Sequence, residues 1–156
     1  MLKYTDTKIV FREVPDEITL AINISGCPCA CEGCHSSYLA GDVGDELLVK
    51  VIKEFIKHYD SISCISFMGG DAEPAEVSRL AAEIKLFAPN LMVAWYSGRD
   101  ELSKEIDLKN FNYIKIGSYQ AKFGGLDSPT TNQRIYKVVN GCELVDITYR
   151  MARGIF

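Results

Sequence analysis

The sequence predicts an α/β fold with a largely parallel β-sheet, built as a single domain over residues 1–156. Strand-like and helix-like segments alternate between residues 18 and 116, which is the pattern of parallel strands joined by helices. Hydrophobic residues make up 47% of the chain and charged residues 24%, a composition typical of globular proteins with a sizeable core. A length of 156 residues also suits one domain.

Apolar and alternating runs indicate where the strands lie. The expected strands cover residues 8–14, 18–24, 62–67, 91–96, 113–116, 135–139 and 144–149. Helical spacing of apolar residues predicts one helix with Asp45 as its N-cap and its end near Tyr59, and a second with Pro74 in its first turn. A short helix is expected over 100–106. Residues 118–134 show little periodicity and are expected to form a long loop, which in compact domains is often functional.

Charge and hydropathy narrow the classes of partner. A formal net charge of −4 argues against a broad surface for nucleic acid or anionic membrane. No apolar run approaches the roughly 20 residues that span a bilayer, and the N-terminus lacks the apolar segment of a secretory signal. We therefore expect a cytoplasmic protein with no direct nucleic-acid or membrane partner. Disulfides are rare in that compartment, so clustered cysteines indicate metal or redox chemistry.

Cysteines concentrate in one short stretch that follows the second expected strand. Cys27, Cys31 and Cys34 have the spacing C-x3-C-x2-C, and Cys29 lies inside the longer gap. Gly33 is one of the residues that break regular structure here and let the backbone wrap a compact object. Thiolates this close on a loop can converge on one metal centre.

Two further strands also end in loops that look chemical. Gly69, Gly70 and Asp71 follow the strand over 62–67, and Ser97 with Gly98 follows the strand over 91–96. Because the carboxyl ends of parallel strands share one edge of a sheet, we expect these loops to meet the cysteine loop there. The convergence of all these loops predicts a ligand site at that edge.

These motifs together resemble the radical S-adenosylmethionine (SAM) superfamily. The spacing of Cys27, Cys31 and Cys34 is similar to its cluster motif, and the wider string 26–35 resembles the activating proteins of anaerobic ribonucleoside-triphosphate reductases. Residues 68–74 resemble the Gly-Gly-Glu-Pro segment of that family, 95–98 its Tyr-(Thr/Ser)-Gly segment and 126–134 its Asn-Gln-Arg stretch. In two places the sequence departs from the pattern. Asp71 stands where Glu is usual, and Gly33 stands where many members of the superfamily carry an aromatic residue.

The resemblance implies a partial (β/α) barrel, a shortened form of the radical-SAM core. It implies a 4Fe–4S cluster held by Cys27, Cys31 and Cys34, with one iron left open for SAM. Reductive cleavage of SAM then gives a 5′-deoxyadenosyl radical that takes a hydrogen from a glycine Cα of the reductase. The cofactor carries this chemistry, so no side chain is assigned as catalytic. Cys29 is expected to be a bystander, because a fourth cysteine ligand would remove the open site; alternative ligation or a redox role is the other interpretation of this residue.

Further residues follow from the same resemblance. The residues expected to contact SAM are Gly33, Gly69, Gly70, Asp71 and Ser97. Within the loop over 118–134, Asn132, Gln133 and Arg134 are expected to bind the glycine-carrying segment of the partner. That partner is the large subunit of the anaerobic reductase, and an external one-electron reductant such as flavodoxin or ferredoxin supplies the electron.

Other functions fit parts of the same pattern. A radical SAM enzyme could act on a different glycyl radical protein or on a small molecule. A zinc-binding module would use Cys27, Cys31, Cys34 and either Cys29 or His35, but it gives the Gly-Gly-Asp segment no role. A ferredoxin-like electron carrier would need four ligands for its cluster and no SAM site.

Overall fold

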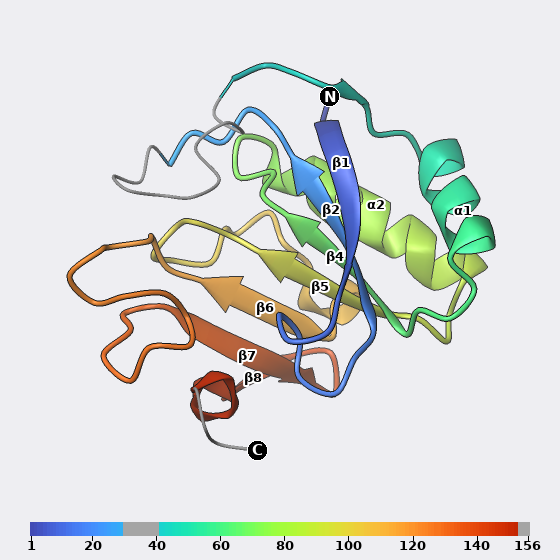
Figure 1. Ribbon diagram of the computed structural model, residues 1–156. Helices are drawn as coiled ribbons and strands as arrows, with labels where there is room; N and C mark the ends of the chain where they lie inside the picture. Colours follow the sequence, from blue (N-terminus) through green and yellow to red (C-terminus); the bar gives the residue numbers. More distant parts are fainter. Residues whose placement is uncertain (30–40, 153–156) are drawn as a thin grey trace.

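The computed structural model describes residues 1–29 and 41–152. The strands form one mixed sheet in the order β3-β1-β2-β4-β5-β6-β7-β8 (Figure 1). They are β1 (Lys3–Val10), β2 (Thr19–Ile24), β3 (Asp45–Glu46), β4 (Cys64–Met68), β5 (Met92–Tyr96), β6 (Tyr113–Ile116), β7 (Arg134–Val139) and β8 (Glu143–Asp146). The helices are α1 (Val49–His58) and α2 (Pro74–Phe87), with the 3-10 helices η2 (Leu108–Asn110) and η3 (Thr148–Met151). No helix in the described ranges combines the length and the apolar character that a membrane span needs.

The centre of the sheet is parallel and its two sides are antiparallel. β2, β4, β5 and β6 run parallel to one another. On one side β1 pairs antiparallel with β2 and β3 with β1, and on the other side β7 pairs antiparallel with β6 and β8 with β7. The predicted α/β class with a parallel centre is therefore confirmed, as a mixed sheet with few helices. The partial barrel stays a prediction.

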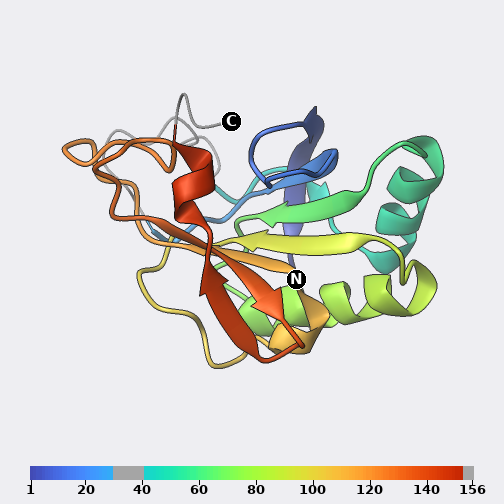
Figure 2. The same cartoon turned by 90° about the horizontal axis from the view of Figure 1, so that it is seen from below.

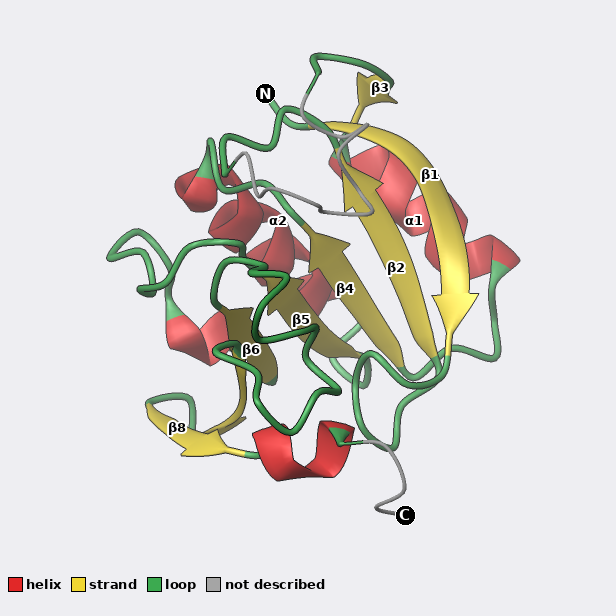
Figure 3. Ribbon diagram, turned by 60° about the vertical axis from the view of Figure 1, so that its left-hand side comes forward, coloured by secondary structure: helices red, strands yellow, loops and turns green. Residues whose placement is uncertain are grey.

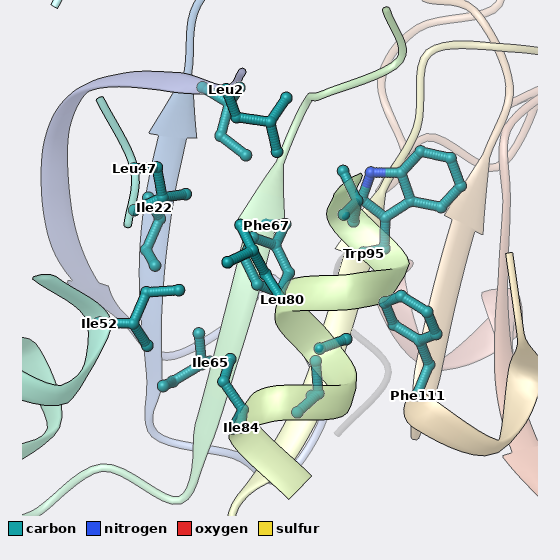
Figure 4. Close-up of a cluster of buried hydrophobic side chains, with 14 of the residues drawn as sticks. Leu2, Ile22, Leu47, Ile52, Ile65, Phe67, Leu80, Ile84, Trp95 and Phe111 are labelled. Atoms are coloured by element: carbon teal, nitrogen blue, oxygen red, sulfur yellow. The ribbon is translucent and has the colours of Figure 1, made fainter. Parts of the chain in front are cut away.

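One face of the sheet carries the main core. α1 and α2 pack on this face, and alternate residues of the central strands point toward them, because successive side chains of a strand face opposite ways. The cluster includes Ile22, Ile52, Ile65, Phe67, Leu80, Ile84 and Trp95 (Figure 4). A shift of one residue in strand register would turn these side chains away from the helices, so their burial holds the register.

The opposite face of the same strands has a smaller core. Cys64, Ala94 and Tyr113 pack there with Val14 and Ile147. Figure 2 shows η3 and α2 on opposite sides of the sheet. Buried side chains therefore occupy both faces of the central strands, which leaves the strand ends as the place for polar chemistry.

Some predicted elements have other bounds or another conformation. Asp45 does not cap a helix: it pairs with β1 as part of β3, and α1 begins only at Val49. The short helix over 100–106 is absent from the described residues, and the Asp100 carboxylate instead accepts hydrogen bonds from Ser118. The first strand lies over 3–10 rather than 8–14. The last one ends at Asp146, where a turn leads into η3.

The carboxyl ends of the parallel strands define the functional edge. The arrowheads of β2, β4, β5 and β6 point the same way in Figure 1, and Figure 3 turns that edge forward. Residues 117–133 leave this edge at the end of β6 and lead to β7, without regular strands of their own beyond one bridge between Gln120 and Gly124. The expected long loop is therefore confirmed.

Candidate functional site

The loops that follow β2, β4 and β5 meet at the carboxyl edge. Cys27 and Cys29 come from the first loop and Asp71 from the second. The two sulfur atoms and a carboxylate oxygen of Asp71 all lie within 4.8 Å of one another. The predicted convergence is confirmed for these residues of the first two loops, and Ser97 and Gly98 of the third loop also contact Asp71. Cys31, Cys34, Gly33 and His35 lie outside the described residues.

Asp71 is the hub of the hydrogen bonds in this site. Its side chain is buried, with only 5% of the residue exposed. It accepts hydrogen bonds from the Ser97 hydroxyl, from the Gly98 backbone N–H at 3.0 Å and from the Cys29 thiol at 3.6 Å. Ser97 is itself 1% exposed, and its hydroxyl oxygen accepts from the backbone N–H of Arg99 at 3.1 Å. One carboxylate thus joins all three loops.

Gly69 and Gly70 shape the loop that carries Asp71. Their φ angles are +112° and +92°, in the left-handed region that favours glycine. A Cβ on Gly70 would also lie 2.6 Å from Val77 in α2, so the backbone can approach the helix only without a side chain. The carbonyl of Gly69 accepts a hydrogen bond from the indole N–H of Trp95 at 2.7 Å and keeps its second lone pair.

The Cys29 thiol lies in a confined, polar place. Burial, reinforced by the nearby Asp71 carboxylate, raises the pKa of this thiol to about 12. At neutral pH a free Cys29 is therefore a neutral thiol that can donate to Asp71. A Cβ built on Gly98 would lie 2.9 Å from the Cys29 sulfur, so the thiol fills the space that a side chain at position 98 would need.

Lys115 is a residue of this site that the sequence analysis missed. It lies in β6 and is buried, with its ammonium donating to the carbonyls of Ser97 at 3.0 Å and Gly117 at 2.9 Å. These contacts tie the ends of β5 and β6 together behind Asp71. The available signal was the single charged residue in the apolar run Tyr113–Ile116, which could have been recognised as a buried cation at a strand end.

A pocket of about 560 Å³ opens beside Asp71. Trp95 and Pro74 line it, together with Arg99 and the residues over 100–104. Its volume is within the range of small-molecule sites, which is roughly 300–1,000 Å³. The pocket brings the buried carboxylate and the exposed Arg99 into one cavity, so a ligand there would meet both signs of charge.

The three expected partner residues lie in different surroundings: Asn132 and Gln133 end the 117–133 loop, and Arg134 begins β7. The Asn132 amide donates to the carbonyl of Ser118 at 3.0 Å, and its Oδ1 is buried with no hydrogen-bond partner among the described residues. Gln133 is buried against Gly117, whose Cβ would lie 2.8 Å from its Cα. Arg134 is about half exposed and lies 3.7 Å from Asp146 of β8.

The close packing of Gly98 on Cys29 gives a first testable prediction. Gly98→Ala is expected to lower the free energy of unfolding by about 1–3 kcal/mol, because the new methyl group would overlap the sulfur. In a Cys29→Ala background the nearer contact is gone, and part of the loss should be recovered. Denaturant unfolding of the wild type, both single variants and the double variant measures this coupling.

Gly125→Ala is the matched control for this series. A Cβ at Gly125 would meet only an Asp127 oxygen at 3.5 Å, an ordinary contact, and its stability should stay close to that of the wild type. Strictly additive effects of Gly98→Ala and Cys29→Ala would contradict the contact between the two residues.

Comparison with known families gives one match. The model of a family described as "4Fe-4S single cluster domain" matches residues 18–120, from the start of β2 to beyond β6. The matched segment contains all three loops that meet at Asp71. Neither the curated proteins nor the solved structures contain a match to this chain.

Proposed function

Because the chain belongs to the family of 4Fe–4S single cluster domains, we propose that it is a radical SAM enzyme that activates an anaerobic ribonucleotide reductase. In this proposal it removes a hydrogen from a glycine Cα of the reductase and leaves a glycyl radical there. The observation that carries the proposal is the meeting of the cysteine, Gly-Gly-Asp and Ser-Gly loops at one buried carboxylate. A simple electron carrier has no need for the second and third of these loops.

The donor set fits an iron–sulfur cluster. Cys27 offers a soft thiolate at the strand end, and iron–sulfur clusters are held by such ligands. In the proposal Cys27 holds one iron, and Cys31 and Cys34 hold two others. When bound and reduced, the cluster supplies the electron that cleaves SAM to methionine and a 5′-deoxyadenosyl radical.

The residues around Asp71 suit the methionine part of SAM. An ionised carboxylate has about four acceptor positions, and the oxygens of Asp71 accept from three donors among the described residues. The proposal places the amine of SAM at the fourth position, where it donates a charge-assisted hydrogen bond to the buried carboxylate. The Gly69 carbonyl, which among the described residues accepts only from Trp95, is a second acceptor. Gly70 and Ser97 hold the loops in place, and Gly33 completes the proposed set.

The 117–133 loop is proposed to receive the glycine-carrying segment of the reductase. It starts at the same edge as the SAM residues, since it follows β6 directly. Asn132 is proposed to support this surface from within the loop, where its amide donates to the Ser118 carbonyl at 3.0 Å and joins the start of the loop to its end. Arg134, the first residue of β7, is half exposed and is proposed to contact the partner directly, while the buried Gln133 holds the end of the loop against Gly117. The shortened barrel, a cytoplasmic location and a flavodoxin-like or ferredoxin-like reductant are parts of the same proposal.

Product formation tests the proposed function. The protein is purified without oxygen, reconstituted with iron and sulfide, and mixed with SAM and dithionite. 5′-Deoxyadenosine is expected only when the cluster is reduced, and with the reductase present a glycyl radical should appear in the EPR spectrum. If the protein holds iron but makes no 5′-deoxyadenosine even with the reductase present, the result favours an electron carrier over a radical SAM enzyme. If it holds zinc and rejects iron, the cluster assignment is wrong.

A further inference from the structure

Cys29 lies directly beside the proposed SAM site, in contact with Asp71 and close to Cys27. Its thiol lies 3.6 Å from the Asp71 oxygen that also accepts from Gly98, and Asp71 is the proposed acceptor for the SAM amine. The thiol and the amine would therefore lie side by side on the same carboxylate. The sulfur atoms of Cys27 and Cys29 are also close enough to reach one metal centre together with Asp71.

We propose that Cys29 is an exchangeable fourth ligand of the cluster, which binds the open iron when SAM is absent and is displaced when SAM arrives. This inference rests on the proposed function, since it needs the open iron and SAM. It replaces the expectation that Cys29 is a bystander. A permanent fourth cysteine would block the site, whereas an exchanging one leaves it available to the substrate.

The surrounding chain gives the thiol room to lie at this position. Gly98 has no positive φ that would demand glycine, yet a Cβ there would come within 2.9 Å of the Cys29 sulfur and 3.2 Å of its Cβ. The absence of a side chain at position 98 is thus explained by the space that Cys29 fills. Asp71 offers the released thiol a hydrogen-bond acceptor, so Cys29 has a defined resting place after displacement.

The exchange changes ligands and leaves the electron count unchanged. As Cys29 binds iron, its thiol proton passes to water and an iron–sulfur bond forms. As SAM binds, the bond between Cys29 and the iron breaks. The ammonium of SAM gives up a proton and the departing thiolate takes one up by way of water, and the neutral amine and the carboxylate of SAM then bind the iron. No oxidant or reductant takes part.

Two physical consequences follow from the exchange. A fourth thiolate covers the iron that would otherwise be lost first on oxidation. It also makes the cluster more negative, which lowers its reduction potential, because the potential depends on net charge. When SAM binds, its amine and carboxylate replace that thiolate, and its sulfonium adds a positive charge, so the site becomes less negative. The cluster should therefore accept an electron more readily once the substrate is in place.

The test compares wild-type protein with Cys29→Ala and with Cys142→Ala, the exposed thiol that serves as the matched control. All three are reconstituted anaerobically as full chains. Without SAM, mild oxidation is followed by EPR and Mössbauer spectroscopy to measure loss of the fourth iron. SAM affinity is then measured by equilibrium dialysis with the oxidised cluster, so that no turnover occurs.

The expected results differ from those of a structural role. Cys29→Ala should lose the fourth iron severalfold faster than the wild type, and SAM should protect both proteins. Cys29→Ala should also bind SAM severalfold more tightly, because no internal ligand has to be displaced. Cys142→Ala should match the wild type in both measurements. A residue that only packs against the site, or that contacts SAM, would weaken SAM binding when removed.

Other results would overturn the inference. Equal iron loss in the wild type and in Cys29→Ala means that Cys29 does not bind the iron. If Cys29→Ala loses iron faster but binds SAM more weakly than the wild type, SAM does not displace Cys29 from the iron. Failure of both Cys29→Ala and the size-matched Cys29→Ser to keep any cluster, with normal thermal unfolding, makes Cys29 a permanent ligand. If the wild type binds no SAM, the proposed function fails and the displacement with it, while the iron-loss comparison still decides the ligation.

Discussion

Cys27→Ala is expected to abolish cluster retention and 5′-deoxyadenosine formation. The wild type should hold about four iron atoms per chain, as a 4Fe–4S cluster requires, and the variant should hold almost none. Cys27 is the proposed ligand that the structure places at the end of β2, beside Asp71. Removing one of the three permanent thiolates leaves only two of them beside the exchangeable Cys29, which is too few fixed donors for a stable cubic cluster. Iron and sulfide analysis after anaerobic reconstitution, with the visible absorption spectrum, measures the loss. Cys31→Ala and Cys34→Ala are expected to behave in the same way.

The control for this series is another cysteine of the same chain. Cys142 is exposed between β7 and β8, at the far side of the sheet from β2. Cys142→Ala should keep its iron and its product formation. A Cys27→Ala protein that retains a full cluster would show that Cys27 is not a ligand, and the ligand set would then have to be drawn from the remaining cysteines.

Asp71→Asn is expected to have the second large effect. The amide keeps the size of the carboxylate but loses its charge, and its NH2 group would face donors such as the Gly98 N–H. SAM binding should weaken by roughly tenfold to a hundredfold, because a hydrogen bond to a charged group contributes about 1.5–3 kcal/mol. The free energy of unfolding should fall by about 1–3 kcal/mol, since a buried donor is left without its partner.

Two variants define what the Asp71 result means. Asp60→Asn changes an exposed carboxylate that follows α1 and should alter neither quantity. Asp71→Glu restores the residue that is usual in the resembling family, keeps the charge and should bind SAM better than Asp71→Asn. Equilibrium dialysis and thermal unfolding measure both effects. Unchanged SAM affinity in Asp71→Asn would remove Asp71 from the proposed SAM site, whatever happens to stability.

Local patterns in the sequence were enough to predict most of the framework. The runs around 18–24, 91–96 and 113–116 became β2, β5 and β6, and Pro74 begins α2 as expected. These elements depend on the spacing of apolar residues, which is a property of neighbouring positions. The α/β order in turn predicts that the loops after β2, β4 and β5 share one edge. The family match agrees with the cluster that the cysteine spacing indicated.

Long-range pairing overrode local patterns elsewhere. Asp45 is a good N-cap by residue type, yet its backbone is used by β1, more than 40 residues earlier in the chain. The apolar run over 144–149 turns after Asp146, because the Thr148 hydroxyl accepts a hydrogen bond from the backbone of Ile135 in β7. These contacts join residues far apart in the chain, so they cannot be predicted from the residues adjacent in the sequence.

The sequence by itself determined the class of this protein: an α/β domain with a cysteine loop of iron–sulfur type, because apolar periodicity and ligand spacing are local features. Only the tertiary structure decided which side chains share the site. It brought the Cys29 thiol to Asp71 and the Lys115 ammonium to the Ser97 carbonyl, and it placed the Cys29 sulfur where a side chain at position 98 would have to lie. Each of these depends on how neighbouring strands align in the sheet, and that alignment is determined by burial of the whole core rather than by any one segment.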